Sequence, residues 1–445
     1  MSHRNLILLF GALVVSYACY VRAEQNPYAR YVAAGFSIID RWALENAPDQ
    51  ELFDAAMNGM VGVLREHGDE HTDFIDAARQ KAFREEFEQE FGGVGLRLWL
   101  LGKPPLPTVV GLPEPGTPAA EANIKLGDRL EAVDGKSVAG MADLEAVTAL
   151  VRGPTDTPVT LTLSRPGQDE SRDVTIQRAI ITVESVLGDV HSPDGRWNYL
   201  ISEEPRIGYA RIKQFGDKTS AELAALLADL TADEKPLDAF IIDVRDDPGG
   251  ALDAAVEICD LFLRAGLTIV TTKGRDKVTV LDRYMSSGSG NSKLPLAVLI
   301  DRNSASASEI VAACMQDHDR GAIVGERSYG KGTVQRLIHV ESGRSLLKLT
   351  TATYWSPLDR NIHRMPGDGP TSTWGVTPSP ELTVTLDEKE YEAWRHYRIR
   401  RDLVGDDVNS PLAAELNLAN GEIPAEFADR TLQRAVVHLK EQLAR

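Results

Sequence analysis

The 445-residue sequence has fewer basic than acidic residues, and no dense basic cluster offsets this difference. It contains 48 lysines and arginines against 66 aspartates and glutamates, which gives a formal net charge of −18. Proteins bind nucleic acids largely by placing basic residues on phosphates, so no nucleic-acid partner is expected. The apolar share of 43% and the charged share of 26% are typical of a soluble globular protein. The length predicts roughly two to four domains.

Cysteine is scarce, and no apolar run is clearly long enough to span a membrane. Cys19 lies in an N-terminal apolar run, Leu6 to Val21, which is short for a membrane helix. Cys259 and Cys314 both lie in apolar helical patterns. We expect them to be buried free thiols, although a disulfide between them stays open in an oxidising compartment.

The N-terminus has the pattern of an export signal. His3 and Arg4 precede the apolar run, and Val21-Arg22-Ala23 follows it with the small residues of a cleavage site. We therefore expect residues 1–23 to be a signal peptide and the protein to be exported, either to the periplasm or out of the cell. A retained segment that anchors the protein in a membrane is the alternative.

A module of short alternating strands follows an N-terminal helical region. It resembles a PDZ domain in Phe91 to Leu96, Pro118 to Ala120, Leu126 to Asp128 and the Val133 to Gly135 turn. Glycines ahead of an edge strand leave backbone N–H groups free for a terminal carboxylate, while the peptide adds as a strand. The resemblance implies that four residues contact this carboxylate: Gly93, Val94, Gly95 and Leu96. The loop does not fit G-x-G-x-x-G, so a nucleotide is not expected there.

Ser306 lies where a strand-like run meets a helix-like run. A serine at this corner can act as a nucleophile, because the unpaired N–H groups and positive end of the helix stabilise an oxyanion. Ser306 and Glu309 also form the S-x-x-E pattern of a capping box, so the serine could simply cap the helix. Position alone leaves both interpretations open.

The base that would activate Ser306 is not an obvious histidine. No G-x-S-x-G elbow surrounds any serine. His318 would stand about 18 Å from Ser306 along one continuous helix, and no local motif marks His339 or His363. Lys331 is the other candidate, with flanking glycines that let the backbone fold closely around it. Burial or a nearby positive charge would have to lower its pKa by several units.

Two other patterns suggest a nucleotide or a metal. Gly325 to Lys331 spells most of a P-loop, but Gly332 stands where Ser or Thr must hold Mg²⁺. His67 to His71 spells H-x-x-E-H, a zinc motif that requires a helix, whereas Gly68 and Asp69 are poor interior helix residues. We expect neither a nucleotide nor a metal cofactor.

Three further motifs follow the PDZ-like module in order: Asp243 to Gly250, Ser304 to Glu309, and Tyr329 to Gln335. Leu347 to Ala352 also matches. Over residues 27–385 the sequence thereby resembles the C-terminal processing (tail-specific) proteases, which are PDZ-containing serine peptidases. The resemblance implies an α/β crotonase-like (ClpP/crotonase-type) protease core with an inserted PDZ domain and helical N- and C-terminal segments.

The resemblance also implies boundaries and roles. The segments are a signal peptide (1–23), an N-terminal helical region (24–90), the PDZ domain (91–178), the serine protease core (179–386) and a C-terminal helical region (387–445). Ser306 would be the nucleophile, Lys331 the general base and Gln335 the residue that orients the lysine. The oxyanion donors would be backbone N–H groups of three residues: Gly249, Gly250 and Ala307.

The sequence departs from the family pattern near these residues. Asp301 and Asn303 stand where the family usually has Asn and Gly, and Asp247 replaces the usual Asn of D-x-R-x-N-P-G-G. Asn303 is tolerable where Gly supplied a positive φ, because asparagine adopts such values more readily than most residues. Both candidate catalytic side chains are kept.

The sequence therefore predicts an exported serine endopeptidase. Its PDZ domain would bind protein substrates with exposed apolar C-termini, and cleavage would occur near those C-termini. The alternative is a catalytically silent PDZ scaffold that binds exported protein tails. The helical ends could form a homodimer, or their apolar stripes could pack on the core instead.

Overall fold

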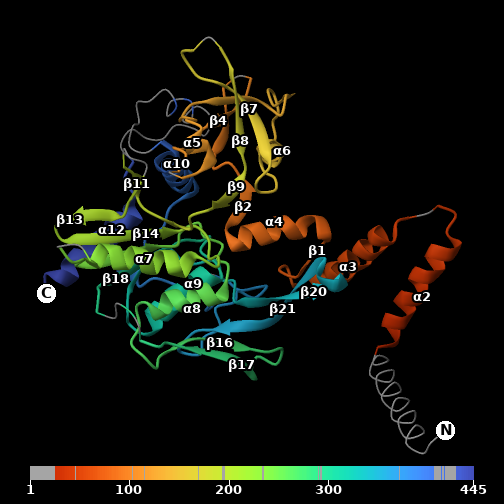
Figure 1. Ribbon diagram of the computed structural model, residues 1–445. Coiled ribbons are helices and arrows are strands. Elements are labelled where there is room, and N and C mark those ends of the chain that lie inside the picture. Colours follow the sequence, from red (N-terminus) through yellow and green to blue (C-terminus); the bar gives the residue numbers. More distant parts are fainter. Residues whose placement is uncertain are drawn as a thin grey trace, which may run out of the picture. The chain divides into compact units, whose positions relative to one another are not determined.

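The computed structural model describes residues 26–445 except 46, 103, 115, 169, 193–195, 233–234, 289, 291–292, 370, 405–411, 413–414 and 416–426. The predicted signal peptide, residues 1–23, lies outside the described residues. The chain forms two compact units (Figure 1). Of the described residues, one unit comprises those up to 77 together with 337–349, and the other comprises those within 78–336 and 350–445.

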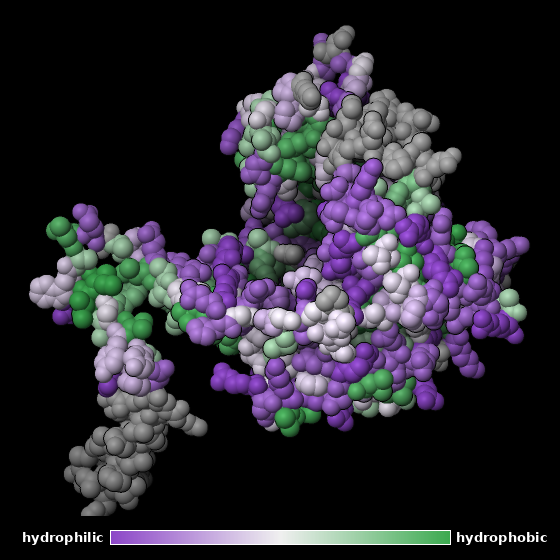
Figure 2. Space-filling view, turned by 180° about the vertical axis from the view of Figure 1, so that it is seen from behind, coloured by the Kyte–Doolittle hydropathy of each residue, from purple (hydrophilic) through white to green (hydrophobic). Residues whose placement is uncertain are grey.

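In its described residues, the first unit contains two helices and a short pairing of strands. Its elements are α2 (Pro27–Trp42), α3 (Asp49–Glu66), β1 (Asp73–Ile75), the 3-10 turn η1 (Glu341–Gly343) and the first part of β21 (Ser345–Trp355). Strand β1 pairs antiparallel with residues 346–348 of β21. Helix α2 has no buried residue, and α3 buries only Val61. Apolar side chains therefore lie exposed along both helices, as the green atoms over them in Figure 2 show.

The second unit begins with α4 (Ala77–Glu88) and β2 (Glu90–Gly93), and β2 pairs antiparallel with β9 (Ala179–Thr182). The residues that connect β2 to β9 in the chain form an antiparallel sheet with the strand order β3-β4-β5-β7-β8, and β6 pairs with β5. Its elements are β3 (Leu98–Leu101), β4 (Leu106–Val109), α5 (Pro118–Glu121), β5 (Arg129–Val133), β6 (Lys136–Ser137), α6 (Leu144–Val151), β7 (Pro158–Ser164) and β8 (Arg172–Gln177). Val109, Leu130, Val147 and Leu161 are fully buried in one core, so this module has its own hydrophobic centre.

A parallel sheet forms the centre of the second unit. Its parallel strands are β14 (Arg206–Ile212), β15 (Ala239–Asp243), β18 (Leu296–Ile300) and β19 (Ala322–Gly325). Every residue of β15 and β18 is buried, as expected for apolar strands covered on both faces. Strands β10 (Val186–Leu187) and β13 (Leu200–Glu203) add antiparallel to β14. This arrangement is the α/β core that the sequence predicts for this region.

Helices cover both faces of the parallel sheet (Figure 1). The covering helices are α7 (Thr219–Ala232), α8 (Leu252–Asp260) and α9 (Ala307–Asp317) on one face and α12 (Arg430–Leu443) on the other. Ala435 and Leu439 of α12 are fully buried against the sheet, so the apolar stripe of the last helix packs on the core. Cys259 and Cys314 are buried and free, which confirms the expectation of two buried thiols.

The remaining elements are a second sheet, whose strand β20 continues into the first unit, a separate two-stranded pairing of β11 with β12, and two C-terminal helical segments. They are β11 (Val190–His191), β12 (Trp197–Asn198), β16 (Thr268–Lys273), β17 (Val280–Met285), β20 (Thr333–Val340), η2 (Pro380–Leu382) and α10 (Glu388–Val404). Strand β21 pairs with β16 and with β20, and β16 pairs with β17. Across the described residues, no helix combines the length and the apolar character needed to cross a membrane.

Candidate active site

Ser306 lies at a strained corner between β18 and α9. It is the N-cap of α9, with φ 57° and ψ −114°. A serine rarely adopts a positive φ, so the surrounding structure must hold it there, and such strain often marks a functional residue. The positive φ falls on the serine itself, whereas Asn303 has no positive φ. The proposed reason for tolerating Asn303 in place of Gly is therefore wrong.

Glu309 joins this corner to the Lys331 loop. Its Oε2 accepts the backbone N–H of Ser306 at 3.0 Å and that of Lys331 at 2.7 Å. Its Oε1 accepts the Gly330 N–H at 2.7 Å and the Ser328 hydroxyl at 2.5 Å. Burial raises the pKa of Glu309, while these four donors oppose that rise. One buried side chain thus fixes the backbones of both candidate catalytic residues, a role that its helix-capping pattern predicts only for Ser306.

The glycine loop after β15 approaches the start of α9. Gly249 has φ 94°, and a Cβ on it would lie 2.8 Å from the Ala307 nitrogen and 2.5 Å from the Ala305 oxygen. The Gly249 N–H donates to Asp247 Oδ1 at 2.8 Å. Within the described part of the chain, the backbone N–H groups of Gly250 and Ala307 have no acceptor. Of the two glycines, Gly250 is therefore the one with an open N–H.

Tyr354 is a neighbour of Ser306 that sequence reasoning missed. Burial raises the pKa of Tyr354 to about 12, and the nearby Ser306 side chain opposes that rise, so the Tyr354 hydroxyl and the Ser306 side chain are neighbours. Its backbone N–H donates to the Gly332 carbonyl at 2.8 Å, next to Lys331. The only signal was the matching stretch Leu347 to Ala352, which ends two residues earlier on the same strand.

Gln335 and Lys331 lie near the start of β20. The Gln335 amide nitrogen donates to Thr333 Oγ1 at 2.9 Å and to Thr350 Oγ1 at 3.2 Å. The side chain is therefore held between β20 and β21. The P-loop interpretation lacks its structural context, because the chain runs from β19 to strand β20 rather than into a helix.

The histidines considered as alternative bases, His318 and His363, make contacts elsewhere than at the Ser306 side chain. His318 is the C-cap of α9, whose N-cap is Ser306, so the two side chains lie at opposite ends of one helix. His318 Nε2 lies 2.7 Å from the Thr268 carbonyl oxygen. His363 packs against Gly332, and burial lowers the pKa of His363. The geometry of α9 confirms that His318 is out of reach of Ser306.

The H-x-x-E-H segment does not form the helix that a zinc site of this type requires. Helix α3 ends at Glu66, and His67 is its C-cap. Gly68 has φ 93°, which turns the chain out of the helical path. The two histidines therefore do not share a helical face. The described residues contain no cluster of three or more His, Cys, Asp or Glu that could hold a metal ion.

The predicted carboxylate loop lies just before edge strand β3. Gly93 pairs with Ala179 in the β2–β9 ladder, and the loop then leaves the ladder. Val94 is buried, and Gly95 has φ 81°. In the described structure, the backbone N–H groups of Val94, Gly95 and Leu96 have no acceptor. Three consecutive open donors beside a sheet edge can receive a carboxylate.

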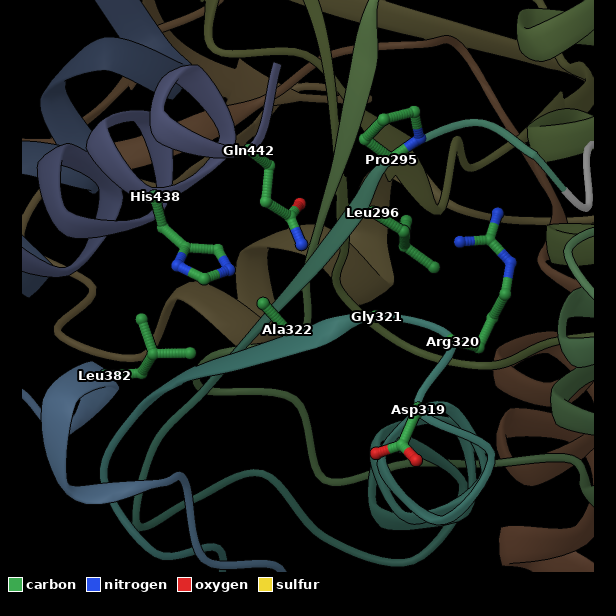
Figure 3. Close-up of a pocket in the computed structure, with 9 residues that line it drawn as sticks. All are labelled: Pro295, Leu296, Asp319, Arg320, Gly321, Ala322, Leu382, His438 and Gln442. Carbon is green, nitrogen blue, oxygen red and sulfur yellow. The ribbon is translucent and has the colours of Figure 1, made fainter. Parts of the chain in front are cut away.

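A cavity of about 470 Å³ lies at the amino ends of strands β18 and β19, whereas Ser306 follows the carboxyl end of β18 (Figure 3). His438 and Gln442 of α12 line it together with Asp319 and Arg320 from the turn after α9. This cavity is therefore not part of the candidate active site.

Comparison with known proteins identifies the class. Residues 206–378 match the model of peptidase family S41, and residues 109–165 match a PDZ-domain model. A carboxy-terminal-processing protease of Bartonella bacilliformis is 36% identical over 390 residues, which cover 86% of this chain and 82% of that protein. A carboxyl-terminal-processing protease of Picosynechococcus is 31% identical over 310 residues, 70% of each chain. The solved photosystem II D1 C-terminal processing protease has 25% identity and a TM-score of 0.43, covering 86% of this chain and 98% of that one.

The fold and the matches thus define a serine-type peptidase that carries a PDZ domain. Within that class, the chain belongs to peptidase family S41 and is a C-terminal processing protease.

Proposed function

We propose that this protease is an endopeptidase in which Ser306 is the nucleophile, Lys331 the general base and Gln335 the residue that orients the lysine. The observation that carries the assignment is the Glu309 carboxylate, which binds the backbones of Ser306 and Lys331 through one oxygen. The strained φ of Ser306 and the open N–H groups at Gly250 and Ala307 support it.

The mechanism follows from these positions. Neutral Lys331 takes the proton of Ser306 as Oγ attacks the scissile carbonyl carbon. The N–H groups of Gly250 and Ala307, at the positive end of α9, stabilise the oxyanion of the tetrahedral intermediate. Lys331 then protonates the leaving amine, and it next activates the water that hydrolyses the acyl-enzyme. The Tyr354 hydroxyl is placed to donate to Oγ when that oxygen carries negative charge. No step needs a metal or another cofactor.

We propose further that the core is crotonase-like (ClpP/crotonase-type), and two features of the core support this. Parallel strands are covered by helices on both faces, and the serine follows the carboxyl end of a central strand. We assign residues 91–178 to the PDZ domain and 179–386 to the protease core. The helical segments 24–90 and 387–445 flank them.

The substrate would be a protein tail with an exposed apolar C-terminus. Its carboxylate would accept from the N–H groups of Val94, Gly95 and Leu96, and its last residues would add as a strand to β3. Strand β3 is an edge of its sheet, and α6 packs beside it, which leaves a place for an added strand. Gly93 would contribute by turning the loop out of the β2–β9 ladder.

The test of catalysis uses a disordered protein with an apolar C-terminus. Wild-type protein should cleave it, whereas Ser306→Ala and Lys331→Ala should each lose cleavage by at least about a thousandfold. Equal cleavage by either variant would remove that residue from the mechanism. Binding of the tail without any cleavage by the wild type would favour the silent scaffold.

The test of tail recognition compares a peptide with its amidated form on the Ser306→Ala variant. The free carboxylate should bind at least about tenfold more tightly, because it gains charge-assisted hydrogen bonds to the loop. Equal affinities would remove the carboxylate-binding role from Val94, Gly95 and Leu96.

We also propose that the N-terminal helices form a homodimer interface. Helix α2 buries none of its residues, and Tyr31, Ile38 and Trp42 are 62%, 59% and 76% exposed. An isolated helix of this length is marginal in water, so its apolar face needs a cover. Light scattering should find a dimer that Ile38→Glu converts to a monomer. A monomeric wild type would contradict this proposal.

Export is the remaining proposal, and it rests on the sequence of residues 1–23 alone. The protein would be delivered to the periplasm or secreted, with the segment cleaved after Ala23 or retained as an anchor. Mass spectrometry of the protein from the cell envelope should find Glu24 as the first residue. An intact N-terminus in the cytoplasmic fraction would contradict export.

A further inference from the structure

The two proposed oxyanion donors belong to different loops, and each loop is held by contacts outside it. Gly250 follows β15, whereas Ala307 follows β18. The distance between their N–H groups therefore depends on the spacing between the Asp246–Gly250 loop and the Asp301–Ser306 loop. Backbone contacts join the loops at one point, where the Ala305 N–H donates to the Asp247 carbonyl at 3.0 Å.

A side-chain cluster ties the outer parts of these loops to helix α10. The Tyr391 hydroxyl donates to Asp246 Oδ1 at 3.0 Å and accepts from Asn303 Nδ2 at 2.6 Å. Asn303 Nδ2 also lies 3.0 Å from Asp246 Oδ1. The three groups form a closed triangle with one member on each loop and one on α10. Asp246 has φ 54°, so its strained backbone also depends on outside support.

Arg245, which directly precedes Asp246, holds the same glycine loop through a second set of contacts. Arg245, which is buried, donates to both oxygens of Asp429 at 2.9 Å and to Asp243 at 2.6 and 2.9 Å. Asp429 also caps α12 by accepting the Leu432 N–H at 3.0 Å. The Arg245 guanidinium lies 4.7 Å from the centre of the Trp394 ring on α10. Both C-terminal helices are thus bound to the residues that precede the glycines.

We propose that Tyr391 is a positioning residue that sets the spacing between the Gly250 and Ala307 N–H groups. This inference rests on the proposed function, in which those two groups bind the oxyanion. Tyr391 lies beyond the residues that match the peptidase family model, which end at 378. The hydroxyl contacts both loops from outside them, as acceptor from Asn303 and donor to Asp246. It adds to the direct link between the loops, in which the Asp301 carboxylate accepts the Asp246 N–H at 3.1 Å. The buried ring, 5% exposed, anchors that atom to the core.

The direct test is Tyr391→Phe, which keeps the ring and removes only the hydroxyl. We expect kcat to fall at least about tenfold, less than the hundredfold or more that follows complete removal of an oxyanion donor. KM should stay within about twofold, because these N–H groups act mainly on the oxyanion of the transition state, while the proposed tail contacts at Val94, Gly95 and Leu96 are unchanged. Tyr397→Phe on the same helix is the matched control, since that ring instead packs at a tilt against Phe427, with the ring centres 4.9 Å apart. Its kcat should equal that of the wild type.

Asn303→Ala is the second variant. Asn303 is exposed, so this change tests the triangle even if the loss of the buried hydroxyl weakens the fold. It should lower kcat by a similar factor, and the double variant should lose little more than either single one, because both break the same connection. Wild-type kcat in both single variants would overturn the proposal. Multiplicative losses in the double variant would also overturn it.

A peptide aldehyde provides a readout that a purely structural role would not change. Its adduct with Ser306 places an oxyanion between the two N–H groups, so Tyr391→Phe should weaken inhibition by the same factor as kcat. Unchanged inhibition with lowered kcat would overturn the proposal. A failure of the proposed function itself would give a different result. If Ser306 were not the nucleophile, Ser306→Ala would cleave like the wild type, whatever the effect of Tyr391→Phe.

Discussion

Replacing Glu309 with glutamine should separate the nucleophile from its base without changing the size of the side chain. The carboxylate accepts three backbone N–H groups and one hydroxyl. Glutamine has one oxygen, which can keep the Ser306 and Lys331 N–H groups. Its NH₂ group would then face the Gly330 N–H and the Ser328 hydroxyl. The hydroxyl can rotate to accept, whereas the Gly330 N–H is left without an acceptor.

The magnitude follows from these contacts. A buried N–H without an acceptor costs about 1–3 kcal/mol, and the two retained bonds weaken because they lose their charge. Removing a buried charge offsets part of this cost, since burial already raises the pKa of Glu309. We expect the free energy of unfolding to fall by about 2 kcal/mol. We expect kcat to fall at least about tenfold, because small shifts of reacting groups have large effects on rate.

Urea unfolding and steady-state cleavage measure the two effects. Glu326→Gln is the matched control, because Glu326 is paired with a half-exposed Arg302 and such pairs contribute about 1 kcal/mol or less. If Glu309→Gln showed the same free energy of unfolding and the same kcat as Glu326→Gln, the proposed role of the Glu309 carboxylate would be refuted. Loss of stability at unchanged kcat would leave Glu309 as a structural residue only.

Three further predictions concern the glycine loop of the active site, the carboxylate loop of the PDZ domain and Asp301. Gly249→Ala should abolish cleavage because its Cβ would lie within 3 Å of backbone atoms, whereas Gly266→Ala, with positive φ but open space, should cleave normally in the same assay. Gly95→Ala should weaken binding of a tail peptide, measured by fluorescence anisotropy, because its Cβ would clash with a neighbouring side chain; Gly116→Ala is the open control, and equal binding by both would contradict this prediction. Burial raises the pKa of Asp301 from 3.8 to about 6, so the folded protein binds more protons than the unfolded chain between about pH 4 and 6, and stability falls as pH rises through that window. Asp301→Asn should remove this loss and raise stability at pH 7 by at most about 3 kcal/mol, with the two proteins converging near pH 4; a lower stability at pH 7 would contradict the sign.

The order of the elements and most candidate residues could be predicted from local patterns. Apolar runs such as Ala239 to Val244 and Leu296 to Ile300 indicate buried parallel strands, and they form as β15 and β18. The position of Ser306 at the start of a helix also follows from its local sequence. His318 could be excluded by helix length alone, and α9 confirms that argument.

Other features depend on residues that are far apart in the chain. Tyr354 reaches Ser306 only because β21 lies beside the loop that carries Lys331. The local pattern of Glu309 predicts one contact with Ser306, but its three contacts with residues 328–331 need the fold. The preference for Gly250 over Gly249 as an open donor required the hydrogen bond from Gly249 to Asp247.

By itself, the sequence determined the family, the PDZ module and the candidate nucleophile and base, because these depend on motifs of a few adjacent residues. Only the tertiary structure decided which distant residues hold the loops of those motifs in position. Tyr391 and Asp429 carry no motif. Tyr391 nevertheless contacts Asp246 and Asn303, and Asp429 contacts Arg245, and these residues directly precede the glycines or the serine. The physical reason is that a hydrogen bond between distant residues depends on their positions in space, which local sequence patterns do not encode.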